Sequence, residues 1–384
     1  MLTYDEAVKD ILSFEFIKEG EAIDVQDSVG RILNVDIRAT LDIPPARTSN
    51  LDGFAFVKAS GDQLKLAGRI VAGQATQMSY DPGQAVAIMT GAVVPAEFDT
   101  VVAIEDCEQI NASLWQIKKM PELGHAIRPR GGDSHIGQVI LPAGTRILPQ
   151  HLAIISAQGL NSIEVRQKAR VVFVSTGAEL VEPGHPLPEG KVYNSSLMML
   201  KALASGCDAD ILYVDHIAVD DAEQFKSVIA AQLALKPDLI VTTGAVSMGT
   251  EDYVPAVFTS LGIDKVFHKV AIKPGKPIWF GKKDQSFVFG LPGNPVSTLL
   301  GWLLFIRPLL GLPAKKLWLP LSEDIQSSMA LSRFLKAKLS GKTVTPLCSQ
   351  DSYQVSSLLD TDCFIRLPAH STANAGDLVE VFLL

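Results

Sequence analysis

Residues 238–254, DLIVTTGAVSMGTEDYV, hold the change of pattern that decides the fold. Apolar residues and threonines at the start predict a buried strand. Small residues follow, then Glu251 and Asp252 side by side, and then a segment with a helical pattern. A buried strand that passes through a small-residue loop into a helix is the repeating unit of a parallel α/β sheet covered on both faces.

The same alternation extends to both sides of this stretch. Further strands are predicted at 168–180 (KARVVFVSTGAEL), 208–219, 265–272, 276–281 and 286–293. Helices are predicted at 193–206, at 220–235 and from Val296 onward. Asp220 precedes the second of these helices, where it is either a simple N-cap or a free carboxylate at the sheet edge. The fold class is therefore α/β plus β.

Changes of texture along the chain predict four domains. Residues 51–135 form a small β-rich domain, and they separate residues 1–50 from residues 136–167 of an N-terminal or linker region. Residues 168–313 form the α/β domain, and 314–384 form a small C-terminal β-domain. Short strands between closely spaced Gly and Pro turns are the basis for the two β-rich predictions.

Composition excludes several classes of protein. The net charge is −8 with no basic block, which argues against a nucleic-acid surface. The apolar run 296–312 contains Arg307 and Pro308 and is shorter than the ~20 residues of a spanning helix, so no membrane association is expected. Four widely spaced cysteines have no metal-binding spacing, and the N-terminus is no signal peptide. We therefore expect a cytoplasmic protein.

Three predicted strand ends carry Gly, Ser and Thr, at 175–180, 242–253 and 290–297. Ligands of open α/β sheets bind at the carboxyl ends of strands, where glycine permits close backbone approach and helix N-termini attract anions. Ordinary turn chemistry explains each loop alone. Three such loops in one domain favour a ligand site.

Lys269, Lys273 and Lys276 crowd the segment HKVAIKPGKPIWFG (268–281). Three neighbouring cations favour a bound anion, although a solvated lysine-rich turn is the alternative. Glu251 and Asp252 would repel that anion unless a cation bridges them. Mg²⁺ held by carboxylates and phosphate is the usual solution, and Asp220 is a candidate second ligand beside Asp252.

Specific motifs add a family resemblance over nearly the whole chain. They include SNLDGFAF (49–56), IRPRGGDSHIGQVILPAGTRI (127–147), TTGAVSMGTEDYV (242–254), KVAIKPGKPIWFG (269–281) and GLPGNPVS (290–297). With these motifs the chain resembles the MoeA, or gephyrin E-domain, family of molybdenum insertases. The nicotinamide dehydrogenases, another class built on an α/β sheet, are excluded because no GxGxxG turn follows a strand.

The resemblance implies an elongated, multidomain enzyme with a central MogA-like α/β three-layer domain and flanking β-rich domains. It also implies that residues 1–50 and 136–167 form one N-terminal or linker domain and that residues 314–384 form a C-terminal β-barrel domain. Such enzymes insert molybdate into adenylylated molybdopterin in the presence of Mg²⁺ and release AMP. They are homodimers whose cleft combines the α/β domain of one subunit with β-domains of the other. A MogA-like molybdopterin adenylyltransferase is the implied donor partner, and no nucleic acid or membrane is involved.

The resemblance also assigns roles to individual residues. The loops would cradle the substrate through Thr176, Gly177, Glu179, Gly244, Ser247, Gly249, Pro292, Gly293, Asn294, Pro295 and Ser297. Lys269, Lys273 and Lys276 would face the dithiolene and molybdate, and Pro277 would also bind the substrate. Asp220 and Asp252 would hold Mg²⁺. Asp52, Thr90, Arg128 and Asp133 would reach the cleft from the N-terminal half. The catalytic set would be Asp52, Asp133, Asp252, Lys273 and Lys276.

Several positions depart from the family pattern. Ala245 replaces a usual glycine, and Tyr353 replaces the glycine of a common Ser-Gly pair. Leu51, Phe54, Pro129 and Leu331 are further departures. They leave open the alternative of a divergent paralogue that binds the pterin as a scaffold protein or that inserts tungsten.

Overall fold

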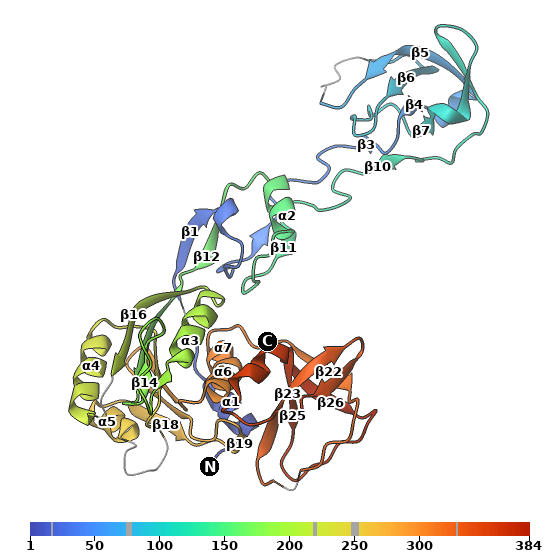
Figure 1. Ribbon diagram of the computed structural model, residues 1–384. Helices are drawn as coiled ribbons and strands as arrows, with labels where there is room; N and C mark the ends of the chain where they lie inside the picture. Colours follow the sequence, from blue (N-terminus) through green and yellow to red (C-terminus); the bar gives the residue numbers. More distant parts are fainter. Residues whose placement is uncertain (17, 74–78, 218–220, 247–252, 328) are drawn as a thin grey trace. The chain divides into compact units, whose positions relative to one another are not determined.

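The computed structural model describes all residues except 17, 74–78, 218–220, 247–252 and 328 (Figure 1). The chain divides into two compact units. Unit 1 comprises residues 1–19 and 167–384, and unit 2 comprises residues 20–166. The finer division into four domains stays a prediction.

A six-stranded sheet forms the centre of unit 1. Its order is β16 (Ala209–Ile217), β13 (Ala169–Thr176), β17 (Leu239–Thr243), β21 (Ser286–Leu291), β20 (Trp279–Lys283) and β18 (Asp264–His268). The first four strands run parallel, as predicted, whereas β20 and β18 pair antiparallel. β18 therefore runs in the same direction as the first four strands, and the prediction of a wholly parallel sheet is wrong for β20. A tight turn at Asp284 joins β20 to β21, and such a turn is too short for a parallel crossover.

Helices cover both faces of this sheet (Figure 1). Alternate strand residues such as Phe173 and Val174 belong to different core clusters, because successive side chains point to opposite faces. One face packs against α3 (Ser195–Ser205) and α6 (Pro295–Gly301), which continues through the π-helical η4 (Trp302–Ile306) into α7 (Arg307–Leu309). The other face packs against α4 (Ala222–Ala234) and α5 (Val254–Ser260).

The N-terminal helix α1 (Tyr4–Leu12) also packs in unit 1. A capping box between Thr3 and Glu6 starts it, and its buried face consists of Tyr4, Ala7 and Ile11. The Tyr4 ring lies 5.2 Å from that of Phe334, in edge-to-face geometry. Residues 1–19 are therefore grouped with the α/β region, whereas the sequence-based division placed them with residues 20–50.

The C-terminal part of unit 1 is a curled β-sheet. Its order is β19 (Ile272–Lys273), β23 (Ser332–Ser340), β25 (Cys363–Leu367), β26 (Leu378–Leu383) and β22 (Lys316–Pro320). β24 (Thr343–Pro346) pairs with β23, and a bridge from Leu321 to Val344 joins the end of β22 to β24. The sheet thus closes on itself, and the 3₁₀ helix η5 (Val355–Asp360) lies in the β24–β25 connection.

Unit 2 consists of short strand pairs and a six-stranded sheet. The pairs are β1 (Gly20–Asp24) with β12 (Ser162–Arg166), β2 (Ile37–Arg38) with β11 (Val139–Leu141), and β3 (Thr48–Ser49) with β10 (Ile127–Arg128). The sheet order is β7 (Thr100–Ala103), β4 (Gly53–Phe56), β6 (Gln84–Ile88), β5 (Gln63–Ile70), β9 (Leu114–Ile117) and β8 (Cys107–Gln109). Helix α2 (His151–Ala157) and the 3₁₀ turns η1 (Val25–Asp27), η2 (Lys58–Ser60) and η3 (Ile104–Asp106) complete it.

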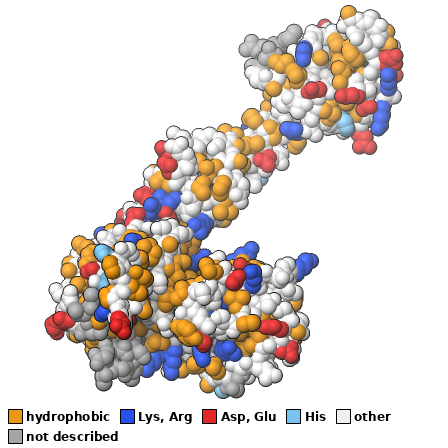
Figure 2. Space-filling view, in the orientation of Figure 1, with side chains coloured by type: hydrophobic (Ala, Val, Ile, Leu, Met, Phe, Trp, Pro, Cys, Tyr) orange, Lys and Arg blue, Asp and Glu red, His pale blue; other side chains and the backbone are white. Residues whose placement is uncertain are grey.

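The distribution of charged side chains on the surface agrees with the net charge of −8 and the absence of a basic block in the sequence. Figure 2 shows acidic and basic side chains on both units, without a broad basic area on the face in view. Among the described helices, none has the length and apolar character needed to cross a membrane.

Candidate active site

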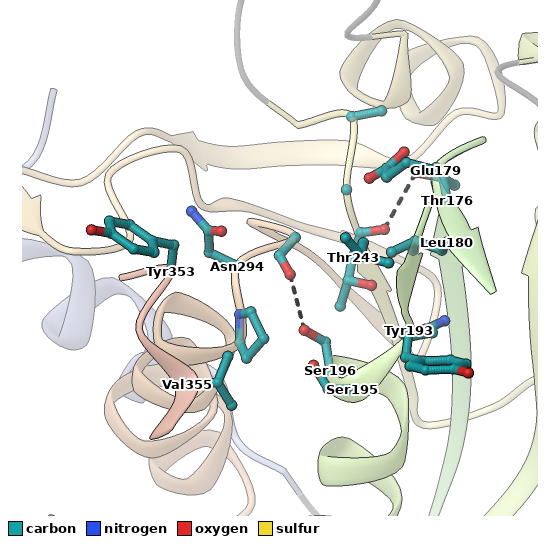
Figure 3. Close-up of a pocket in the computed structure, with 17 residues that line it drawn as sticks. Thr176, Glu179, Leu180, Tyr193, Ser195, Ser196, Thr243, Asn294, Tyr353 and Val355 are labelled. Atoms are coloured by element: carbon teal, nitrogen blue, oxygen red, sulfur yellow. Dashed lines mark hydrogen bonds between the residues drawn. The ribbon is translucent and has the colours of Figure 1, made fainter. Parts of the chain in front are cut away.

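The three predicted loops of unit 1 meet around one cavity of about 600 Å³ (Figure 3). They follow β13, β17 and β21, three neighbouring parallel strands whose carboxyl ends share one sheet edge. Seven residues predicted to bind substrate line the cavity: Thr176, Gly177, Glu179, Gly244, Gly293, Asn294 and Pro295. The topology therefore brings together segments that are more than 100 residues apart in the sequence.

Glycine is required where the loops after β13 and β17 touch. Gly244 has a φ of 94°, and a Cβ on it would lie 2.4 Å from the Thr176 carbonyl oxygen. The Thr176 hydroxyl donates a hydrogen bond of 3.3 Å to the Thr243 carbonyl, drawn in Figure 3. Any side chain at position 244 would push the two loops apart, because the obstructing atom is backbone.

Ala245 keeps the left-handed conformation that its usual glycine would favour. Its φ is 49°, in the left-handed region that glycine adopts without a steric penalty. An L-residue pays roughly 1–2 kcal/mol for this conformation. Val246, the next residue, is buried and accepts a 3.0 Å hydrogen bond from Nε2 of His268, which ties this loop to the lysine-rich segment.

The start of α3 forms a wall of the cavity that the sequence analysis missed. Asn194 caps the helix by accepting from the Leu197 amide at 3.2 Å, and its Nδ2 donates to Ser175 Oγ at 2.7 Å. Ser196 donates to the Gly293 carbonyl at 2.9 Å and so links α3 to the α6 loop. The available signal was the Asn-Ser-Ser sequence at 194–196, which follows a short extended segment and begins a predicted helix.

Eight other lining residues were not predicted individually, although Leu180, Thr243 and Ala245 lie in the predicted loops. They are Leu180, Val192, Tyr193, Ser195, Thr243, Ala245, Tyr353 and Val355. The parallel pairing of β14 (Leu180–Val181) with β15 (Val192–Tyr193) brings the first three to the cavity. The last two come from the C-terminal β-sheet region, where Tyr353 was noted only as a departure from the family pattern and Val355 belongs to no quoted motif.

The cavity has two features that favour an anionic ligand. The N-termini of α3 and α6 both open onto it, and helix N-termini carry partial positive charge. Glu179 is the single carboxylate among the described lining residues. Pro292 and Ser297 flank the lining segment of α6, where the Pro292 carbonyl accepts from the Thr298 hydroxyl and Ser297 is buried.

The lysine-rich segment lies next to this loop system but does not line the cavity. Lys273 and Lys276 are exposed, and Lys269 is half-buried with a φ of 73°. Gly275, between them, comes close to α6, since a Cβ on it would lie 3.8 Å from the Ser297 carbonyl. Pro277 is half-buried in the same segment. The predicted approach of these lysines to molybdate stays a prediction.

Some predicted residues lie outside the described part of the chain. These are Asp220, Ser247, Gly249, Glu251 and Asp252. The prediction that Asp220 caps the following helix is nevertheless wrong. The N-cap of α4 is Asp221, which accepts hydrogen bonds from the Glu223 and Gln224 amides at 2.9 and 3.1 Å.

Unit 2 contains the remaining predicted residues. The Asp52 carboxylate accepts from the amide and the hydroxyl of Thr90, at 2.7 and 2.8 Å. These two bonds, the amide first, hold the pKa of Asp52 below its ordinary value. Arg128 donates through Nε and Nη2 to Asn50 Oδ1, while Asp133 is exposed and anchored through its amide to the Ile43 carbonyl.

Comparison with known proteins identifies the family. The MoeA N-terminal region (domain I and II) matches residues 2–159, the probable molybdopterin binding domain matches 172–311, and the MoeA C-terminal region (domain IV) matches 319–384. A molybdopterin molybdenumtransferase of Synechococcus elongatus is 35% identical over 381 residues, which cover 94% of each chain. The chain belongs to the MoeA family.

Other MoeA relatives support this membership. A molybdopterin molybdenumtransferase of Bacillus subtilis is 33% identical and aligns over 99% of this chain and 93% of its own. The crystal structure of the molybdopterin biosynthesis MoeA protein from Pyrococcus horikoshii OT3 matches all of both chains, with a TM-score of 0.86 at 25% identity. This MoeA-family chain is accordingly a transferase, with the multidomain fold of the family.

Proposed function

We propose that the chain acts in molybdenum cofactor biosynthesis and inserts molybdate into adenylylated molybdopterin, releasing AMP. The observation that carries this proposal is the convergence of the three loops after β13, β17 and β21 on one cavity. A long ligand with phosphate groups fits there, because small residues allow close approach and two helix N-termini favour its negative charge. The relatives' names supply molybdopterin and molybdate as the substrates.

Mg²⁺ is part of the proposal, with Asp220 and Asp252 as its ligands. Within the described residues no group of three or more His, Cys, Asp or Glu side chains is placed to hold a metal ion. One cavity carboxylate, that of Glu179, is available, and this fits an ion that binds one or two carboxylates together with phosphate oxygens. When bound, Mg²⁺ would neutralise charge on the departing phosphate.

The chain's own residues would bind and orient the reactants. Lys269, Lys273 and Lys276 would attract the molybdate dianion, and the backbone at Gly244 and Gly293 would pack against the pterin and phosphate. The lowered pKa of Asp52 keeps this carboxylate ionised near neutral pH. Asp52 or Asp133 would orient water or accept a proton. Thr90 and Arg128 would complete this part of the cleft.

The proposal extends to assembly and location. The chain would work as a cytoplasmic homodimer and would receive its substrate from a MogA-like molybdopterin adenylyltransferase. Each cleft would then combine unit 1 of one subunit with unit 2 residues of the other. This arrangement is taken from the resemblance to the family.

Molybdate-dependent release of AMP tests the reaction. Purified chain is incubated with adenylylated molybdopterin, Mg²⁺ and molybdate, and AMP is quantified. Asp252→Ala and Lys273→Ala should each reduce the rate at least a hundredfold, the usual cost of losing a group that stabilises transition-state charge. Lys265→Ala, which removes another exposed lysine on β18, should not. Unchanged turnover in both site variants, or retention of intact adenylylated pterin by the unmodified chain, would favour the scaffold alternative.

A further inference from the structure

Lys336, on β23, is a buried lysine outside the site described above. Its exposed fraction is 1%, whereas Lys338, two residues later on the same strand, is exposed and pairs with Asp360. Burying an ammonium group costs free energy unless hydrogen bonds compensate it. Lys336 Nζ donates to the Asp351 carbonyl at 3.0 Å and to Ser357 Oγ at 2.6 Å. Both acceptors belong to the segment 347–357, which covers Lys336.

The backbone of Lys336 holds the same segment. Its amide donates to Gln350 Oε1 at 2.9 Å, and its carbonyl accepts from Gln350 Nε2 at 2.9 Å. The Leu347 amide donates to that carbonyl as well, at 2.8 Å. One residue therefore fixes the segment at its start, through Leu347 and Gln350, and at its far end, through Ser357.

This segment is the contribution of the C-terminal β-region to the cavity. Tyr353 and Val355 line it, and among the described lining residues only these two come from beyond α7. Ser352, next to them, accepts a 3.2 Å hydrogen bond from Asn294 Nδ2 at the start of α6. Figure 3 shows Tyr353 and Val355 on the side of the cavity opposite Tyr193.

We infer that Lys336 is a positioning residue for substrate binding: its buried ammonium holds segment 347–357 as a wall of the cavity. The inference rests on the proposed function, because the cavity is taken to bind the adenylylated pterin. Loss of the ammonium leaves the Asp351 carbonyl and the Ser357 hydroxyl without their charged donor, so the wall loosens. The three loops that carry the proposed chemistry are not bonded to Lys336, so turnover of bound substrate should persist.

Lys336→Met tests this role, because methionine keeps the unbranched, apolar stem without the charge. The expected result is a KM for adenylylated molybdopterin raised on the order of tenfold, with kcat changed less than about twofold. Lys338→Met, on the same strand, is the matched control and should alter neither constant. A purely structural role for Lys336 would lower thermal stability and leave KM unchanged in the fraction that stays folded.

Hydrogen exchange of peptides from 347–357 gives a second measurement that does not require turnover. Exchange should accelerate in Lys336→Met and not in Lys338→Met. If Lys336→Met does not fold, Ser357→Ala replaces it, since it removes one acceptor of the ammonium and should raise KM in the same direction. AMP release with unchanged KM and unchanged exchange in the folded variants would overturn the inference alone. Absence of AMP release by the unmodified chain would overturn the proposed function and the inference with it.

Discussion

Asp52 shows how one residue's environment sets its protonation. Two hydrogen bonds from Thr90 stabilise the carboxylate and lower its pKa. A carboxyl group whose pKa is lower in the folded chain stabilises that chain at pH values above the pKa of the unfolded chain. This contribution is lost as the pH falls through the pKa of the folded chain. At neutral pH Asp52 is therefore an acceptor of protons and hydrogen bonds and not a general acid.

Thr90→Val should raise the pKa of Asp52 towards its ordinary value. The substitution removes the hydroxyl donor and keeps the backbone donor, so the pKa should remain partly lowered. Carboxyl ¹³C chemical shifts of aspartate-labelled protein, followed through an acid titration, measure this change. Thr90→Ser, which keeps the hydroxyl, is the control. An unchanged Asp52 titration in Thr90→Val would show that the hydroxyl bond does not stabilise the carboxylate.

At the scale of single elements, helix α4 is capped by Asp221, although the sequence offers Asp220 and Asp221 as equal candidates for its N-cap. Asp221 accepts from the first-turn amides of α4, and Asp221→Ala should cost about 1 kcal/mol of local helix stability. Hydrogen exchange of the Glu223 and Gln224 amides should then accelerate about fivefold, since 1 kcal/mol is a factor of about five.

Asp221→Asn keeps a capping oxygen and should exchange like the unmodified chain. Asp220→Ala should instead lower the apparent affinity for Mg²⁺ in the AMP assay and leave exchange in α4 unchanged. Faster exchange in Asp220→Ala than in Asp221→Ala would contradict the capping assignment.

The elements also show what the sequence can and cannot predict. The apolar runs of β13, β17 and β21 and the glycine-rich loops after them were predictable, because burial and turn chemistry are local properties. The reversed direction of β20 was not, since an apolar run is compatible with either pairing. The place of Tyr353 in the cavity wall was not predictable either, because hydrogen bonds between residues far apart in the sequence, such as Lys336 to Asp351 and Asn294 to Ser352, hold its segment.

At the scale of the whole molecule, family membership covers nearly all of the chain. The three matched regions lie between residues 2 and 384, and the first of them covers residues 20–159 of unit 2. Residues proposed for one reaction are thus divided between units, with Asp52 in unit 2 and Asp252 in unit 1. If the proposed homodimer shares its clefts between subunits, these two residues of one site belong to different chains.

Complementation between inactive subunits tests this arrangement. Asp52→Ala and Asp252→Ala chains are co-expressed with different tags, and the mixed dimers are purified through both tags. A mixed dimer of a two-fold symmetric enzyme with shared clefts has one intact site and one site with both substitutions. It should recover about half of the unmodified activity, because one of its two sites is intact. Dimers of either variant alone, prepared in the same way, are the controls and should stay inactive. If each cleft were instead built from a single chain, every site in the mixed dimer would carry one substitution, and no activity would return.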